Sequence, residues 1–237
     1  YGDHRDLHSF PTRRSSDLDE TSDWMLHTLC LNNVLHENAD MKDRILMEKV
    51  PSSERFLTDI ISAMRDFRVI SLCYQGFRHP EPFCFNVRPY CVKYFKQRWY
   101  LLGDSDLGLR IYSLDRFVDM EELEEHFEIP KGFDAEEYFG NYFGVIIGEE
   151  PEDVKIRVVP DQVKYFRTLP MHGSQRETVQ EDGSSVFSYH IAPTLDFVQE
   201  ILSHGADVEV LEPAELRESV ADIIAGMASR YGLPVSR

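Results

Sequence analysis

Arginine and aromatic side chains concentrate in one stretch of an otherwise acidic chain. Between Arg65 and Arg116, nine basic residues stand against five acidic ones, which gives this stretch a charge of +4. Because the whole chain of 237 residues carries −17, the remainder carries −21. Guanidinium groups donate forked hydrogen bonds to phosphate, and tyrosine and tryptophan rings stack on bases. The basic stretch is therefore a candidate anion site, whereas the acidic remainder argues against nonspecific nucleic-acid binding by the chain as a whole.

Motifs for catalysis and for cofactors are not found in the sequence. The chain contains no GxSxG, HExxH, GxxxxGK(S/T) or GxGxxG pattern, and none of its nine histidines stands near a cysteine or serine in a catalytic arrangement. The acidic pairs Glu121-Glu122 and Glu124-Glu125, beside His126, are expected to be solvated. The sequence thus predicts no enzyme, no metal and no cofactor.

The cysteines and the lengths of the apolar runs indicate the cellular compartment of the protein. Cys30, Cys73, Cys84 and Cys91 form no CxxC pair and have no histidine at the spacing of zinc ligands. We expect buried free thiols in a reducing cytoplasm. No apolar run approaches the roughly 20 residues of a membrane-spanning helix, and no secretory signal is visible. The predicted location is therefore cytoplasmic, with no membrane partner.

Two helices and five strands are predicted in the first half of the chain. One helix begins at Ser22 or Asp23, and another follows Pro51 and ends near Asp66. From Val69 on, apolar residues occur at every second position, which favours strands. The predicted strands are 69–74, 83–94, 98–103, 109–113 and 117–123. Five short strands of this kind suit a small closed barrel.

The last third of the chain predicts a second domain. Its elements are strand 154–159, helix 160–169, strands 176–180 and 185–191, helix 194–205, strand 207–211 and a terminal helix over 213–231. Asp182-Gly183 marks a hairpin, and Gly205 suits the left-handed end of a helix. The order βαββαβ is that of the ferredoxin-like split fold.

These elements divide an α+β chain into five parts. Residues 1–18 are expected to be a non-native leader that packs against nothing, because Arg5–Leu18 resembles a translated sequencing adapter. The native N-terminus is then expected to be lost. The other predicted parts are a helical linker region (19–66), the barrel (67–128), an acidic connector (129–151) and the ferredoxin-like domain (152–237).

The segment around Trp99 resembles the WYL domain of bacterial transcription regulators. Gln97–Gly103 reads QRWYLLG and contains the Trp-Tyr-Leu triplet that names the family. Arg110–Phe117 reads RIYSLDRF and carries the family's Leu-Asp-Arg motif, and Val87–Tyr90 adds an upstream Val-Arg-Pro-Tyr. The resemblance extends from about Leu57 to the C-terminus, and the segment 24–38 is similar to the Bacteroidetes branch of the family.

The resemblance implies an Sm-like five-stranded barrel, a ferredoxin-like C-terminal extension called WCX, and a ligand site on the barrel. The candidate ligand residues are Tyr74, Arg88, Arg98, Tyr100, Arg110, Tyr112 and Arg116. Trp99 is expected to fill the core. For Arg116 the alternative is a structural pair with Asp115 or another carboxylate. Ser113 stands where many family members carry another arginine or a similar polar group. The serine therefore lowers the positive charge of this surface.

The function implied is ligand sensing in a transcription regulator. A nucleotide or single-stranded nucleic acid would bind the barrel and shift the arrangement of a homodimer. Operator DNA would be bound only by a winged helix-turn-helix, which the family carries at its N-terminus and which the adapter sequence would have replaced. The alternative is a non-enzymatic scaffold for protein interaction or dimerisation. A nucleotide-acting enzyme is the weakest hypothesis, because the sequence contains no metal-ligand cluster or nucleophile.

Overall fold

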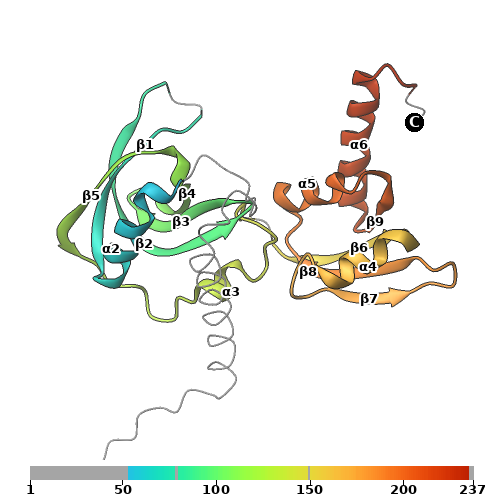
Figure 1. Cartoon of the computed structure of the whole chain (residues 1–237), viewed down its shortest axis with the longest axis horizontal. Helices are drawn as coiled ribbons and strands as arrows, with labels where there is room; N and C mark the ends of the chain where they lie inside the picture. Colours follow the sequence, from blue (N-terminus) through green and yellow to red (C-terminus); the bar gives the residue numbers. More distant parts are fainter. Residues whose placement is uncertain (1–52, 78–79, 149, 235–237) are drawn as a thin grey trace, which may run out of the picture. The chain divides into compact units, whose positions relative to one another are not determined.

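Two separate antiparallel sheets organise the chain (Figure 1). The structure is a computed structural model and describes residues 53–77, 80–148 and 150–234. The predicted leader, the first predicted helix and the WYL-like segment 24–38 lie outside these residues. The α+β class is confirmed, since the described residues contain five α-helices and two sheets, of five and four strands.

The first sheet contains the five predicted strands. They are β1 (Arg68–Tyr74), β2 (Phe83–Phe95), β3 (Arg98–Ser105), β4 (Gly108–Ser113) and β5 (Phe117–His126). The strands pair in the order β4-β3-β2-β1-β5, and every neighbouring pair is antiparallel. β4 and β5 are the edges of this order, and no ladder joins them among the described residues. The strands are as predicted, but closure into an Sm-like barrel is not confirmed.

Helix α2 (Leu57–Arg65) packs against β1 and β2, after a 3-10 turn, η2 (Ser53–Phe56). Ile60 and Ala63 recur at helical spacing on α2 and are completely buried. They share one core cluster with apolar residues of β1, β2, β3 and β4. The buried face of α2 and the buried faces of the strands therefore pack together in one core.

A two-residue turn, Lys96-Gln97, connects β2 with β3. Both residues have positive φ, 45° and 63°. Two-residue hairpin turns of type I′ require this conformation, which side chains disfavour. The register continues directly after the turn, with Phe95 opposite Arg98. The turn thereby fixes the start of the strand that carries the Trp-Tyr-Leu triplet.

Two of the cysteines predicted to be free thiols form a disulfide. Cys73 and Cys84 are opposite each other in the β1–β2 register, and their sulfurs are bonded. The prediction is wrong for this pair because it rested on spacing along the sequence, whereas the antiparallel register brings residues 11 positions apart side by side. Cys91 is a free cysteine, and burial raises the pKa of its thiol to about 11.

Loss of the disulfide is expected to destabilise the protein. Crosslinking a loop of this length removes about 3 kcal/mol of unfolded-state entropy, so Cys73→Ser with Cys84→Ser should lower the free energy of unfolding by about that amount. Urea unfolding with and without a thiol reductant measures the effect. The double variant is the control, because a reductant should not destabilise it further. Equal stability of the oxidised and reduced wild type would contradict the crosslink.

The second sheet forms the C-terminal domain. Its strands are β6 (Glu152–Val158), β7 (Arg176–Val179), β8 (Ser185–Ile191) and β9 (Val208–Glu212), and its helices are α4 (Pro160–Thr168), α5 (Leu195–Ser203) and α6 (Ala214–Arg230). The strands pair in the order β7-β8-β6-β9, all antiparallel. This is the strand order of the ferredoxin-like split fold, as the βαββαβ element order predicts.

Alternating apolar residues in the strands and glycines at the turns explain how this domain forms. Val154, Ile156 and Val158 alternate along β6 and are completely buried, because they face the helices. Gly205 follows α5 with a φ of 61°, the predicted left-handed helix end, and Gly183 has a φ of 83° in the predicted hairpin turn.

A connector with one short helix, α3 (Ala135–Phe139), joins the two sheets along the chain. Asp134 caps this helix, because its carboxylate accepts hydrogen bonds from the backbone N–H groups of Glu136 and Glu137. Among the helices in the described residues, none has the length and apolarity needed to cross a membrane.

Candidate ligand-binding site

The turn between β4 and β5 holds the arginine of the Leu-Asp-Arg motif. The motif forms one turn of 3-10 helix, η3 (Leu114–Arg116). Asp115 accepts hydrogen bonds from the Ser113 hydroxyl and from the guanidinium of Arg98. These contacts fix the turn through Asp115 and leave the Arg116 side chain outside the ion pair.

The Arg116 side chain lies against an exposed aromatic ring. Its guanidinium carbon is 3.9 Å from the centre of the Phe77 ring, and Phe77 is 82% exposed. The backbone N–H of Gln75 donates to the Arg116 carbonyl at 3.1 Å, which ties the loop after β1 to the motif. Arg116 Nε is buried and has no hydrogen-bond partner among the described residues. A charged donor with unused capacity thus stands beside a stacking surface.

An open cavity of about 360 Å³ lies at this point. The loop after β1, the motif and the start of β5 form its walls, with Gln75, Gly76, Phe77, Asp115, Arg116, Phe117 and Val118 as lining residues. Its volume is within the range of small-molecule sites. One arginine beside one exposed ring is the combination that holds a phosphate and stacks a base in single-strand binding proteins.

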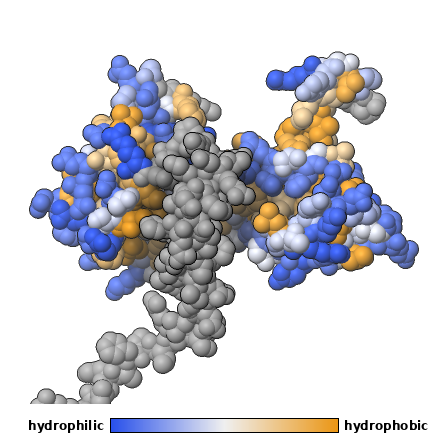
Figure 2. Space-filling view, in the orientation of Figure 1, coloured by the Kyte–Doolittle hydropathy of each residue, from blue (hydrophilic) through white to orange (hydrophobic). Residues whose placement is uncertain are grey.

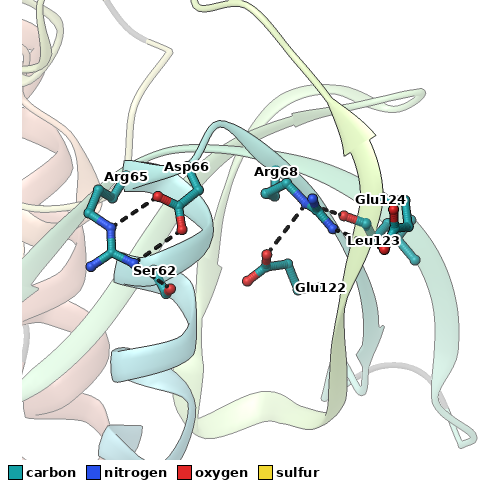
Figure 3. A network of polar contacts seen from close by, with 7 residues as sticks. All are labelled: Ser62, Arg65, Asp66, Arg68, Glu122, Leu123 and Glu124. Carbon is teal, nitrogen blue, oxygen red and sulfur yellow. Dashed lines mark hydrogen bonds and ion pairs between the residues drawn. The ribbon is translucent and has the colours of Figure 1, made fainter.

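Other arginines of the basic stretch are neutralised by carboxylates, as Figure 3 shows for two of them. Arg65 pairs with Asp66 at 3.0 Å and holds the pKa of that carboxyl below its usual value. Arg68 lies 3.4 Å from Glu122 and 3.8 Å from Glu124, and its Nε also donates to a β5 carbonyl. One glutamate of each acidic pair of β5, Glu122 and Glu124, thus lies near Arg68. In the part of the chain that the structure describes, no three metal-ligating side chains gather.

Two predicted ligand arginines are also engaged in ion pairs. Arg88 lies 3.1 Å from Asp104, its register partner on β3. Arg98 forms an ion pair with Asp115 and thereby positions the Leu-Asp-Arg turn. Their contact with a ligand stays a prediction.

Arg110 is exposed and stands apart from Arg116. Its Nε donates to the Leu107 carbonyl at 3.0 Å, in the turn between β3 and β4. Arg116 lies beyond the other end of β4. Within residues 53–77, 80–148 and 150–234, neither arginine is paired with a carboxylate. These are the two predicted arginines whose charges remain available.

The predicted tyrosines lie deeper than the arginines. Tyr74 and Tyr112 are buried with their ring centres 5.5 Å apart, and the Tyr112 hydroxyl lies 3.1 Å from Ser105 Oγ. Burial raises the pKa of Tyr112 and that of the half-buried Tyr100. Trp99 is half-buried and packs against the core cluster without belonging to its buried residues, so it does not fill the core as expected. Ligand contact by the three tyrosines stays a prediction.

Phe77 is the member of this site that sequence reasoning missed. It follows Gln75-Gly76, where the sequence indicates only a turn. The signal available was an aromatic side chain inside a turn-prone segment of the basic stretch, since an exposed ring has no packing reason to be there.

The fold and site define an α+β protein in which a five-stranded antiparallel sheet with a cationic turn precedes a ferredoxin-like domain. Residues 55–122 match the family model of the WYL domain, and residues 150–228 match that of the WCX domain. The chain therefore belongs to the WYL domain-containing proteins, and the resemblance seen in the sequence is confirmed.

Two solved structures are similar to parts of this chain. Proteasome accessory factor B/C (PafBC) of Arthrobacter aurescens is 19% identical, with 78% of this chain and 28% of that chain covered and a TM-score of 0.32. A CRISPR Cas-related protein is 17% identical, with 74% of this chain and 51% of that chain covered and a TM-score of 0.46. No curated protein matches the chain. The chain thus spans about half or less of the length of either solved protein.

Proposed function

We propose that this chain is the ligand-sensing regulatory part of a WYL-family transcription regulator and that a nucleotide or single-stranded nucleic acid binds at Arg116 and Phe77. The observation that carries the proposal is the unpartnered, buried Arg116 Nε beside the exposed Phe77 ring. Membership of the WYL family supports a regulatory role. In this proposal the five strands form an Sm-like barrel, and a separate N-terminal domain contacts operator DNA.

The proposed ligand uses two kinds of contact. A phosphate accepts hydrogen bonds from the Arg116 guanidinium, and a base stacks on Phe77. Arg110, at the other end of β4, attracts the strand electrostatically without a pocket of its own. Ligand binding at the Leu-Asp-Arg motif affects β3 through the ion pair between Asp115 and Arg98. No bond in the ligand is made or broken.

Titration of a fluorescently labelled, single-stranded oligonucleotide tests this proposal through salt dependence. Two phosphate contacts correspond to a slope of about −1.4 in log affinity against log salt. Affinity measured by fluorescence anisotropy should then fall about sevenfold between about 50 and about 200 mM salt. Lack of binding at the lower salt concentration would favour the scaffold alternative instead.

A dimerisation scaffold is the second candidate, and helix α6 favours it. Ile224, Met227 and Tyr231 recur at i, i+3 and i+7 and are 52%, 50% and 79% exposed. Figure 2 shows apolar surface along α6. A second copy of the chain would bury this stripe symmetrically. The two candidates are compatible, since a sensing module can act through the arrangement of a homodimer.

A further inference from the structure

A second cavity, of about 470 Å³, lies in the C-terminal domain. Its apolar walls come from the end of α4, from the loop after it and from the connector, through Phe143, Tyr165, Phe166, Leu169, Pro170 and Met171. None of these residues belongs to the Arg116 site. Leu169 is 80% exposed at this cavity, although an apolar side chain gains free energy by burial. The volume and the largely apolar lining are those of a small-molecule site.

The polar end of the cavity is formed by Glu200 and His204 on and after α5. His204 Nε2 is buried and has no hydrogen-bond partner among the described residues. Its distance to Glu200 Oε1 is 3.9 Å, too long for a hydrogen bond. The imidazole ring packs on Phe166, with ring centres 4.7 Å apart. Glu200 therefore offers a carboxylate oxygen at the polar end of the cavity, whereas the His204 nitrogen is covered by protein atoms.

The second oxygen of Glu200 is already engaged. Oε2 lies 2.9 Å from Nζ of Lys96, the residue held at positive φ in the β2–β3 turn. The Lys96 side chain is 47% exposed, so this ion pair is a weak one. Among the residues that line the cavity, Glu200 is the one with a carboxylate, and Lys96 is not a lining residue.

We propose that this cavity binds a small aromatic amine. The aromatic body fills the space between Phe143, Phe166 and Met171, and the protonated amino group donates to Glu200 Oε1. A carboxylate-bearing ligand is disfavoured, because its charge would face Glu200. The proposal goes beyond nucleic-acid sensing and does not depend on the Arg116 site.

Removal of Lys96 is expected to change the affinity for the amine in the opposite direction to removal of the Glu200 charge. The Lys96 ammonium on Glu200 Oε2 repels a ligand ammonium on Oε1 and neutralises part of the carboxylate charge, so removal of Lys96 should strengthen amine binding. The amine then also weakens a contact between the WYL sheet and α5, which makes the cavity a second effector site.

Isothermal titration calorimetry with tryptamine tests the proposal, with 3-ethylindole and indole-3-propionate as neutral and anionic comparators. Glu200→Gln should weaken tryptamine binding at least about tenfold, because a charge-assisted hydrogen bond is lost. Lys96→Ala should strengthen it about two- to fivefold. Glu209→Gln is the matched control, since it removes the same charge from an exposed ion pair with Arg217 in the same domain. Its affinity for tryptamine should equal that of the wild type.

Three results would overturn the proposal. They are equal tryptamine affinity in the wild type and Glu200→Gln, tighter binding of indole-3-propionate than of tryptamine, and no heat of binding with any of the three compounds. Circular dichroism of each variant establishes that it is folded. Oligonucleotide affinity without tryptamine should be unchanged in Glu200→Gln, so failure here is separable from failure at Arg116.

Discussion

Replacement of Arg116 with alanine is expected to weaken binding of a short single-stranded oligonucleotide roughly ten- to hundredfold. The lost contacts are charge-assisted hydrogen bonds, worth about 1.5 to 3 kcal/mol. Thermal unfolding should change little, because Arg116 Nε has no partner among the described residues and the Phe77 ring under the guanidinium is exposed. Fluorescence anisotropy and a thermal melt on the same preparations measure both quantities.

Matched variants separate a ligand role from a structural one. Arg176→Ala removes an exposed arginine on β7 of the other sheet and should leave oligonucleotide affinity unchanged. Arg110→Ala added to Arg116→Ala should weaken binding further and flatten the salt dependence. If Arg116→Ala unfolds at a lower temperature and binds as well as the wild type, the arginine is structural.

The second large effect is expected at helix α6. Ile224→Glu with Met227→Glu places two charges in the exposed apolar stripe and should convert a dimer into monomers, because isolated carboxylates are costly to bury. The far-UV circular dichroism should be retained, since neither side chain belongs to the core. Light scattering coupled to size-exclusion chromatography measures the mass.

The control for α6 adds the same charge to the opposite side of the helix. Gly226→Glu with Ser229→Glu alters exposed positions and should leave the dimer intact. A monomeric wild type at micromolar concentration, or equal dissociation by both pairs of substitutions, would argue against the α6 stripe as the interface.

Local patterns were sufficient to predict most of the fold. The change from helical spacing to alternation near Val69 located β1, and Asp182-Gly183 located the β7–β8 hairpin, because turns and faces are set by neighbouring residues. The position of Gly205 predicted the end of α5 for the same reason. Such features need no information about distant contacts.

Features set by strand register were not predictable in this way. The Cys73–Cys84 bond depends on which residues of β1 and β2 are opposite each other. The pairing of Arg98 with Asp115 depends on how β3 meets the Leu-Asp-Arg turn. Alternation placed Arg110 and Tyr112 on one face, but the structure shows the arginine exposed and the tyrosine buried. The candidate site was therefore found through Arg116, while Phe77 required the structure.

Photocrosslinking tests the central claim most directly. An oligonucleotide carrying 5-bromodeoxyuridine is irradiated with the protein, and the crosslinked peptides are identified by mass spectrometry. A base stacked on Phe77 should crosslink to the peptide that contains it, and Phe77→Ala should abolish that crosslink. Crosslinks confined to peptides without Phe77 and Arg116, or a yield unchanged by Phe77→Ala, would contradict a ligand site at these residues.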